Sequence, residues 1–204
     1  MTADPTITDT TATASGAARG TRDLVLDAVS ALLRQRRWSS ITMTDVAGVA
    51  GVSRQTVYNE FGNRHGLVTQ YAVRLGERFA ALVAEALHAH PDDVRGALLA
   101  GFRAFVLTMS SEPLVISLAT ESTPDLLRLV TVESATIRDR AGAILADTLR
   151  TGWVGLDDAT ATAVSRTIVR LALSYVSMPP DAGQDPAEEF ADLFAPYLES
   201  TISR

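Results

Sequence analysis

The residues with the most specific chemistry lie in one short polar stretch, Ser53 to Arg64. Arginine can donate two parallel hydrogen bonds to guanine O6 and N7, and glutamine can pair with adenine N6 and N7. Hydroxyl groups and the free N–H groups at a helix N-terminus suit phosphate oxygens. These residue types predict a surface that contacts duplex DNA, formed by Ser53, Arg54, Gln55, Thr56, Tyr58, Asn59 and Arg64.

Two short helices joined by a glycine turn are expected to position this surface. Thr42 and Asp45 have the three-residue spacing of a capping box, which begins the first helix. Gly51 then supplies the positive φ of a sharp turn. In the second helix, Val57 and Phe61 lie four residues apart and are expected to point inward, so the polar residues face outward. This arrangement predicts a helix–turn–helix.

The remainder of the chain is predicted to be helical, which makes the fold all-α with about nine helices. Apolar residues recur at helical spacing from Thr21 onward, and no segment shows convincing two-residue alternation. Residues 1–18 contain one large aliphatic side chain, Ile7, and are predicted to form a disordered tail. We expect a helix–turn–helix domain over residues 19–66 and a second helical domain over residues 67–204.

The charged residues are unevenly distributed along the chain. Its 204 residues include 24 acidic and 18 basic side chains, a net charge of −6, and every basic residue is arginine. Residues 19–70 carry a net charge of +3, and residues 71–204 carry a net charge of −7. A polyanion responds to the local charge, because salt screens charges beyond about 8–10 Å. The acidic total therefore does not exclude a nucleic-acid partner.

Several other classes of function are not expected. The chain has no cysteine, which excludes disulfides, thiolate metal sites and cysteine nucleophiles. No apolar run approaches the roughly 18–20 residues that span a bilayer, and no secretory leader opens the chain, so we expect a cytoplasmic protein without a membrane partner. His88 and His90 lie two apart at a helix end and point to different sides, so no metal site is expected. No enzyme motif occurs, and neither catalysis nor a cofactor is expected.

The helix–turn–helix stretch resembles that of the TetR family of transcription regulators. The matching residues are the string A-G-V-S-R-Q-T-V-Y-N-E-F-G-N-R, from Ala50 to Arg64, and T-M-T-D-V-A, from Thr42 to Ala47. The resemblance implies an N-terminal DNA-binding domain, followed by a ligand-binding and dimerisation domain. It also implies base contacts from Arg54, Gln55 and Tyr58 and phosphate contacts from Thr44, Thr56 and Arg64. Thr42 and Asn59 complete the predicted DNA-binding set.

One residue departs from the family pattern. Many members have a neutral or basic residue where this chain has Glu60, and a carboxylate there would repel phosphate. We expect Glu60 to pair with Arg64, four residues later.

A narrower resemblance concerns four short strings: Y-N-E-F-G, E-P-L, R-L-A-L-S-Y and A-P-Y-L. Together they are similar to an actinobacterial branch that includes regulators of alkane-monooxygenase and rubredoxin operons. These regulators are thought to sense fatty acids or acyl thioesters. This resemblance implies an effector that is long and apolar with a polar head.

Two sets of apolar residues are candidates for binding within the second domain. The effector is expected to contact Phe102, Phe105, Met109, Leu118, Leu129 and Ile137, although residues at this spacing can equally be plain core. Arg103, Arg128 or Arg138 could meet a ligand carboxylate, but a solvated or salt-bridged arginine is favoured. A homodimer is expected to form through the last two helices, using Val164, Ile168, Leu171, Tyr175, Phe190, Leu193, Phe194 and Leu198.

The leading interpretation is a ligand-responsive repressor that binds a palindromic operator as a homodimer. A helical protein–protein interaction module that no longer contacts DNA is the alternative, motivated by Glu60 and the acidic total. An enzyme is the third class, which would require turnover of a candidate ligand.

Overall fold

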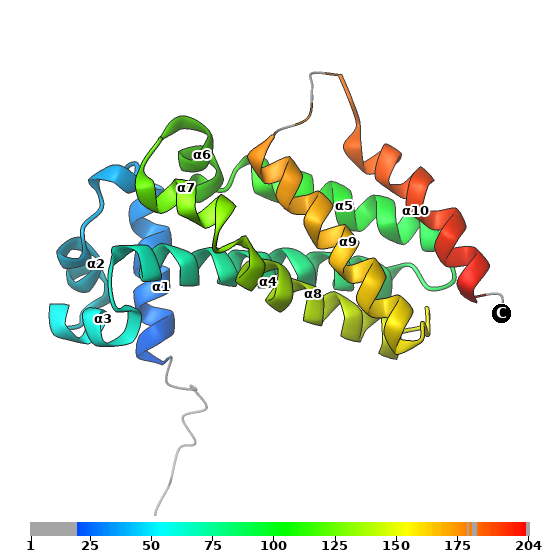
Figure 1. The fold of residues 1–204 in the computed structure, drawn as a ribbon, viewed down its shortest axis with the longest axis horizontal. Coiled ribbons are helices and arrows are strands. Elements are labelled where there is room, and N and C mark those ends of the chain that lie inside the picture. Colours follow the sequence, from blue (N-terminus) through cyan, green and yellow to red (C-terminus); the bar gives the residue numbers. More distant parts are fainter. Residues whose placement is uncertain (1–19, 179, 181–182, 203–204) are drawn as a thin grey trace, which may run out of the picture.

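The computed structural model describes residues 20–178, 180 and 183–202, and of Val130 only the backbone. This part of the chain consists of ten α-helices and one short 3-10 helix, without a strand (Figure 1). The all-α prediction is confirmed, with one helix more than the count of about nine. The predicted disordered tail, residues 1–18, lies outside the described residues.

The helices follow one another with short connections. The first half of the chain contains α1 (Thr21–Leu33), the 3-10 helix η1 (Trp38–Ser40), α2 (Met43–Ala50), α3 (Arg54–Phe61) and α4 (Arg64–Ala89). The second half contains α5 (Val94–Ser110), α6 (Pro113–Thr120), α7 (Pro124–Thr131), α8 (Ser134–Thr151), α9 (Asp158–Ser177) and α10 (Pro186–Ile202).

The first three helices and the start of α4 pack around one apolar core. Trp38, Ile41 and Val57 are almost completely buried in it. In Figure 1, α4 runs from this end of the molecule along most of its length. Since α4 begins at Arg64, the predicted domain boundary between residues 66 and 67 falls inside its first turn, and the division into domains stays a prediction.

A second core lies where the far half of α4 packs against α5 and α8, with α9 and α10 on the outside. Phe102 of α5 is almost completely buried in it. The Phe102 ring stacks on Phe190 of α10 with centroids 4.3 Å apart, and it meets Tyr175 of α9 edge-on at 5.5 Å. These ring contacts hold α9 and α10 against α5.

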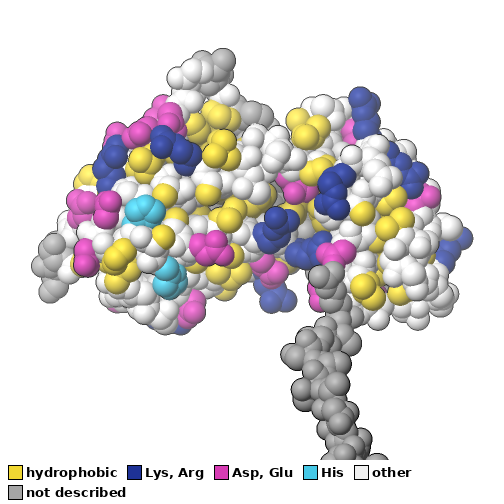
Figure 2. Space-filling model, turned by 180° about the vertical axis from the view of Figure 1, so that it is seen from behind, with side chains coloured by type: hydrophobic (Ala, Val, Ile, Leu, Met, Phe, Trp, Pro, Cys, Tyr) yellow, Lys and Arg dark blue, Asp and Glu magenta, His cyan; other side chains and the backbone are white. Residues whose placement is uncertain are grey.

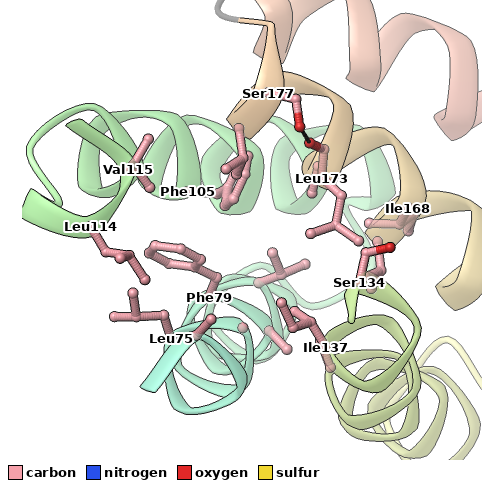
Figure 3. A pocket seen from close by; sticks show the side chains of 18 of the residues that line it. Leu75, Phe79, Phe105, Leu114, Val115, Ser134, Ile137, Ile168, Leu173 and Ser177 are labelled. Atoms are coloured by element: carbon pink, nitrogen blue, oxygen red, sulfur yellow. Dashed lines mark hydrogen bonds between the residues drawn. The ribbon is translucent and has the colours of Figure 1, made fainter. Parts of the chain in front are cut away.

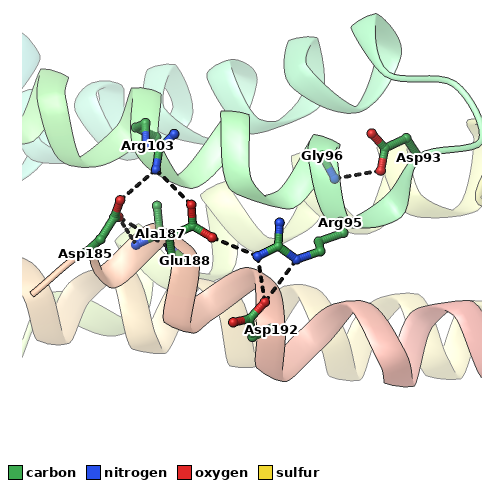
Figure 4. A network of polar contacts seen from close by, with 8 residues as sticks. All are labelled: Asp93, Arg95, Gly96, Arg103, Asp185, Ala187, Glu188 and Asp192. Atoms are coloured by element: carbon green, nitrogen blue, oxygen red, sulfur yellow. Dashed lines mark hydrogen bonds and ion pairs between the residues drawn. The ribbon is translucent and has the colours of Figure 1, made fainter.

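Ion pairs also join α10 to α5 (Figure 4). The Arg95 guanidinium contacts Glu188 and Asp192, each at 2.7 Å, and the Arg103 guanidinium contacts Asp185 at 2.6 Å. All five groups are about half exposed, so each pair stabilises the fold only slightly. The favoured interpretation of Arg103, a solvated or salt-bridged side chain, is confirmed.

The charges seen in sequence also separate in space. On the face shown in Figure 2, Asp and Glu gather toward the half that holds α5 and α10, whereas Arg predominates toward the end with α1 to α3.

Among the described helices, no single one has both the length and the apolar composition of a membrane span, although α5 and α6, joined at a 64° bend, pass that test as a pair.

Candidate nucleic-acid interface and apolar cavity

The first helix of the helix–turn–helix begins with a complete capping box. The Thr42 hydroxyl accepts a hydrogen bond from the Asp45 backbone N–H at 3.2 Å, and the Asp45 carboxylate accepts one from the Thr42 N–H at 2.9 Å. The hydrogen bonds from Thr42, with a further one from Arg36, lower the pKa of Asp45 from 3.8 to about 2. The predicted cap is confirmed, and its carboxylate is ionised at neutral pH.

The turn and the second helix also form as predicted. Gly51 has a φ of 68°, the left-handed region that favours glycine. Ser53 caps α3 by accepting a hydrogen bond from the Thr56 N–H at 3.0 Å. Val57 and Phe61 are buried on the inner side of α3. The outer side of α3 is therefore turned to solvent.

Two pairs of polar side chains lie along this outer side. The Arg54 guanidinium donates to the Tyr58 hydroxyl at 3.3 Å and lies 5.2 Å from the centre of its ring. The Gln55 amide donates to Asn59 Oδ1 at 2.7 Å. Arg54, Gln55 and Asn59 are exposed, and Tyr58 is half-buried. The four side chains therefore form a polar row on the outer side of α3.

The hydroxyl groups predicted to contact phosphate lie near the helix starts. Thr42 and Thr44 are exposed at the beginning of α2. Ser53 is exposed and Thr56 half-buried at the beginning of α3, where their hydroxyl oxygens are 2.8 Å apart. The structure thus brings eight of the nine predicted DNA-binding residues to the helix–turn–helix surface.

Arg64 is the exception, because the polar groups of its side chain contact other residues of the chain. Its guanidinium lies over the Trp38 ring at 4.3 Å, donates to the carbonyls of Trp38 and Ile41, and pairs with Asp125 of α7. Glu60 does not pair with Arg64 as expected; it pairs with Arg22 of α1 at 3.0 Å. The first turn of α4 directs Arg64 toward η1 and α7, away from Glu60.

The segment from α6 to α7 is tied to the helix–turn–helix end by carboxylates. Glu121 accepts hydrogen bonds from the backbone N–H groups of Trp38 at 3.1 Å and Ser39 at 2.8 Å. Burial raises the pKa of Glu121, but hydrogen bonds, chiefly from Ser39, outweigh that effect and lower it below its usual value. Asp125 holds Arg64. We call Glu121 and Asp125 the strap carboxylates. Sequence reasoning missed them, since their partners lie 61 or more residues away.

An apolar cavity of about 100 Å³ lies between α4, α5, α6, α7, α8 and α9. Figure 3 shows Phe79, Ile137 and Leu173 pointing into it from three different helices. Five of the six predicted effector contacts line it: Phe102, Phe105, Leu118, Leu129 and Ile137. Met109 does not, because it is buried in the core elsewhere along α5. Sequence reasoning missed the walls supplied by α4 and α9, which include Leu75, Phe79, Leu173 and Val176.

The predicted dimer face needs a correction. Val164, Ile168, Phe190 and Leu198 are buried in the core of this chain, so they are not available to a partner, and Ile168 lines the cavity. An amphipathic pattern cannot tell a core inside one chain from an interface between two. Leu171, Tyr175 and Phe194 are half-buried, and Leu193 is 74% exposed. Tyr197, one turn beyond Leu193 and 53% exposed, extends this face.

The remaining polar candidates have partners within the chain. The ring Nδ1 atoms of His88 and His90 lie within hydrogen-bond distance of the carbonyls of Ala84 and Ala86. Arg138 pairs with Asp139 at 2.7 Å, and Arg128 lies 3.7 Å from Glu133. In the described ranges, no three His, Asp or Glu side chains are grouped so as to hold a metal ion.

Comparisons with known proteins agree with this geometry. Residues 93–196 match the family model described as the bacterial tetracyclin repressor, C-terminal domain. The HTH-type transcriptional regulator AlkX of Mycobacterium tuberculosis is 50% identical over 179 residues, which cover 87% of this chain and 85% of that protein.

Two of the solved structures that share the fold are similar to this chain to different degrees. The TetR family repressor AlkX from Dietzia sp. strain DQ12-45-1b, implicated in biodegradation of n-alkanes, superimposes with a TM-score of 0.83 at 38% identity, covering 89% of this chain and 96% of that chain. Thermus thermophilus FadR, solved in complex with lauroyl-CoA, has a TM-score of 0.52 at 21% identity, over 87% and 93% of the two chains. At that identity FadR shows the fold alone.

Proposed function

The chain belongs to the TetR family of transcriptional regulators, and on that premise we propose a repressor that a small apolar effector releases from a palindromic operator. The observation that carries the proposal is the exposed row of Arg54, Gln55, Tyr58 and Asn59 on a capped α3. Arg54 and Gln55 are of the types that recognise guanine and adenine in the major groove. The solved relative AlkX from Dietzia is a repressor, which supports repression rather than activation.

Two copies would pair through the exposed parts of α9 and α10. Leu193, Phe194 and Tyr197 offer an apolar strip there, bordered by Leu171 and Tyr175. A two-fold axis through this strip would place two copies of α3 about one DNA turn apart, or a multiple of it, on a palindromic site.

The cavity is the site for the effector, and α4 connects it to the DNA-contacting end. The same helix begins with Arg64 beside η1 and supplies Leu75 and Phe79 to the cavity wall. An effector has to bind the DNA-free conformation more tightly, or the equilibrium does not shift. The Dietzia repressor's link to n-alkanes supports an effector from alkane metabolism, with a fatty acid or acyl thioester as the narrower possibility.

Catalysis has little support from the site. The polar side chains in the cavity wall are Ser134 and Ser177, and the wall contains neither histidine nor carboxylate to activate them.

A regulator that contacts the chromosome works in the cytoplasm, as the sequence predicts. The interaction-module alternative loses one of its two motives, since Arg22 offsets the charge of Glu60.

A gel-shift titration against duplex DNA from upstream of the gene tests this proposal. A DNA-binding regulator loses affinity steeply as salt rises, with a slope set by the number of phosphates it contacts. The Gln55→Ala variant should bind more weakly, whereas Gln184→Ala, at an exposed position before α10, serves as a matched control. Absence of DNA binding even at low salt would favour the interaction module.

A further inference from the structure

A short basic segment follows α1, with three arginines within four residues: Arg34, Arg36 and Arg37. No other stretch of four residues in the sequence contains three. All three arginines are exposed, whereas Leu33 before them and Trp38 after them are buried. The chain on both sides of the basic segment is therefore anchored in the apolar core, and the arginines are held at the surface.

Two of the three arginines keep their charge without a carboxylate partner. Arg36 pairs with Asp45 of α2 at 3.1 Å. The Arg34 guanidinium donates to the Ser30 hydroxyl at 2.9 Å, which leaves its charge in place. The Arg37 side chain forms no hydrogen bond or ion pair within the part of the chain that the structure describes.

The basic segment lies next to the start of α2, where two of the predicted phosphate contacts are located. The Arg36–Asp45 pair joins the segment to the first turn of α2, and Thr42 and Thr44 are exposed there. Charges act over about 8–10 Å in salt, so the segment and these threonines can act on the same phosphates. By pairing with Asp45, Arg36 also offsets a carboxylate that would repel phosphate.

A further carboxylate adjoins the segment without cancelling its charge by an ion pair. Glu121 accepts hydrogen bonds from the backbone N–H groups of Trp38 and Ser39. It pairs with no arginine among the described residues. The basic segment therefore still presents free guanidinium groups beside the helix–turn–helix.

We propose that Arg34 and Arg37 contact the sugar–phosphate backbone of DNA beside the groove that α3 enters, and that they add affinity without sequence discrimination. The inference rests on the proposed function as a DNA-binding regulator. Arginine can donate two parallel hydrogen bonds to one phosphate. Contacts to phosphate position a protein on the duplex, whereas contacts to base edges carry the sequence information. In this division, α3 selects the operator and the basic segment strengthens binding to any duplex.

The test measures binding of the full-length protein to two labelled duplexes by fluorescence anisotropy. One is the upstream duplex, and the other is a scrambled duplex of the same length and composition. Arg37→Ala should weaken binding to both by the same factor. It should also reduce the slope of log K against log salt by about one for each protomer that contacts the DNA. The loss of affinity should then be about three- to fourfold larger at 50 mM than at 200 mM salt for each contact removed.

Three further variants separate this role from a change in folding or in base recognition. Arg37→Lys keeps the charge and should retain the wild-type salt slope. Arg78→Ala removes an exposed arginine that lies about 21 Å along α4 from its start, and should leave affinity and slope unchanged. Gln55→Ala should lose affinity for the upstream duplex and keep its affinity for the scrambled one.

Two results would overturn the inference. One is a wild-type salt slope in both Arg34→Ala and Arg37→Ala, and the other is a loss of affinity confined to the upstream duplex. A wild-type protein that binds neither duplex at low salt would overturn the proposed function as well. The two failures are therefore distinguishable.

Discussion

Arg54 is exposed on α3, and we expect it to contact a base edge. Its partners on α3 are a hydroxyl and a ring face, neither of which neutralises its charge. We expect Arg54→Ala to weaken operator binding by about 1–3 kcal/mol, about 5- to 150-fold, because a bidentate contact to guanine is lost. Gel-shift titration with the same upstream duplex DNA measures the change.

A matched control is available at Arg150, which pairs with Asp147 and Asp158 at the far end of α8. Arg150→Ala should leave operator affinity within about twofold, since the lost charge is distant and screened. Unchanged affinity in both Arg54→Ala and Tyr58→Phe would show that other residues contact the bases.

Asp45 gives a prediction about pH. Its pKa is about 2 in the folded chain, below the ordinary 3.8, because the Thr42 side chain and backbone donate to its carboxylate. The folded value is the lower one, so the cap stabilises the fold fully above about pH 4–5 and the effect is lost as pH falls toward 2. The melting temperature of Asp45→Asn should lie below that of the wild type at pH 6, and the gap should close on acidification. A gap that is constant with pH would contradict this role.

At the scale of elements, α6, α7 and the residues between them contact both the apolar cavity and the helix–turn–helix end of the molecule. Leu118 and Leu129 line the cavity, whereas Glu121 and Asp125 hold η1 and the start of α4. A ligand that displaces the cavity wall would therefore move the strap carboxylates. We propose that this segment couples the cavity to the helix–turn–helix alongside α4.

Glu121→Gln tests this connection with little change in shape. Without the negative charge, the two hydrogen bonds to η1 are weaker, because an ionised acceptor binds N–H groups more strongly than an amide. Amide hydrogen exchange at Trp38 and Ser39 should accelerate, as measured by NMR or mass spectrometry. Asp139→Asn, on α8, is the control and should leave exchange at η1 unchanged. Wild-type exchange rates in Glu121→Gln would show that Glu121 does not hold η1.

At the scale of the whole molecule, the exposed strip on α10 predicts the oligomeric state. Leu193 is 74% exposed, and Tyr197 follows one turn later. We expect Leu193→Glu to convert a dimer to a monomer, because the interface would bury an unpaired charge. Sedimentation or light scattering gives the mass, and operator affinity should fall together with it.

Leu127→Glu is the control, since Leu127 is 54% exposed on α7, away from the strip. It should leave the mass unchanged. A wild-type protein that is monomeric at the concentrations used for DNA binding would contradict the proposed pairing.

The sequence by itself determined the helix–turn–helix. The capping box at Thr42 and Asp45, the left-handed Gly51, the Ser53 cap and the inward spacing of Val57 and Phe61 each depend on residues at most four apart. Their conformations follow from local hydrogen bonds and sterics, so they can be inferred without knowledge of the rest of the fold. The family and the all-α class follow from the same local patterns.

The tertiary structure alone decided which apolar face meets which surface. Periodicity showed that Met109 and Ile168 would be buried, but not that Met109 lies outside the cavity and Ile168 lines it. It also could not reveal that Arg64 pairs with Asp125, 61 residues away. An amphipathic helix specifies that a face avoids water. Only the packing of distant helices determines whether that face meets a core, a ligand or a second chain.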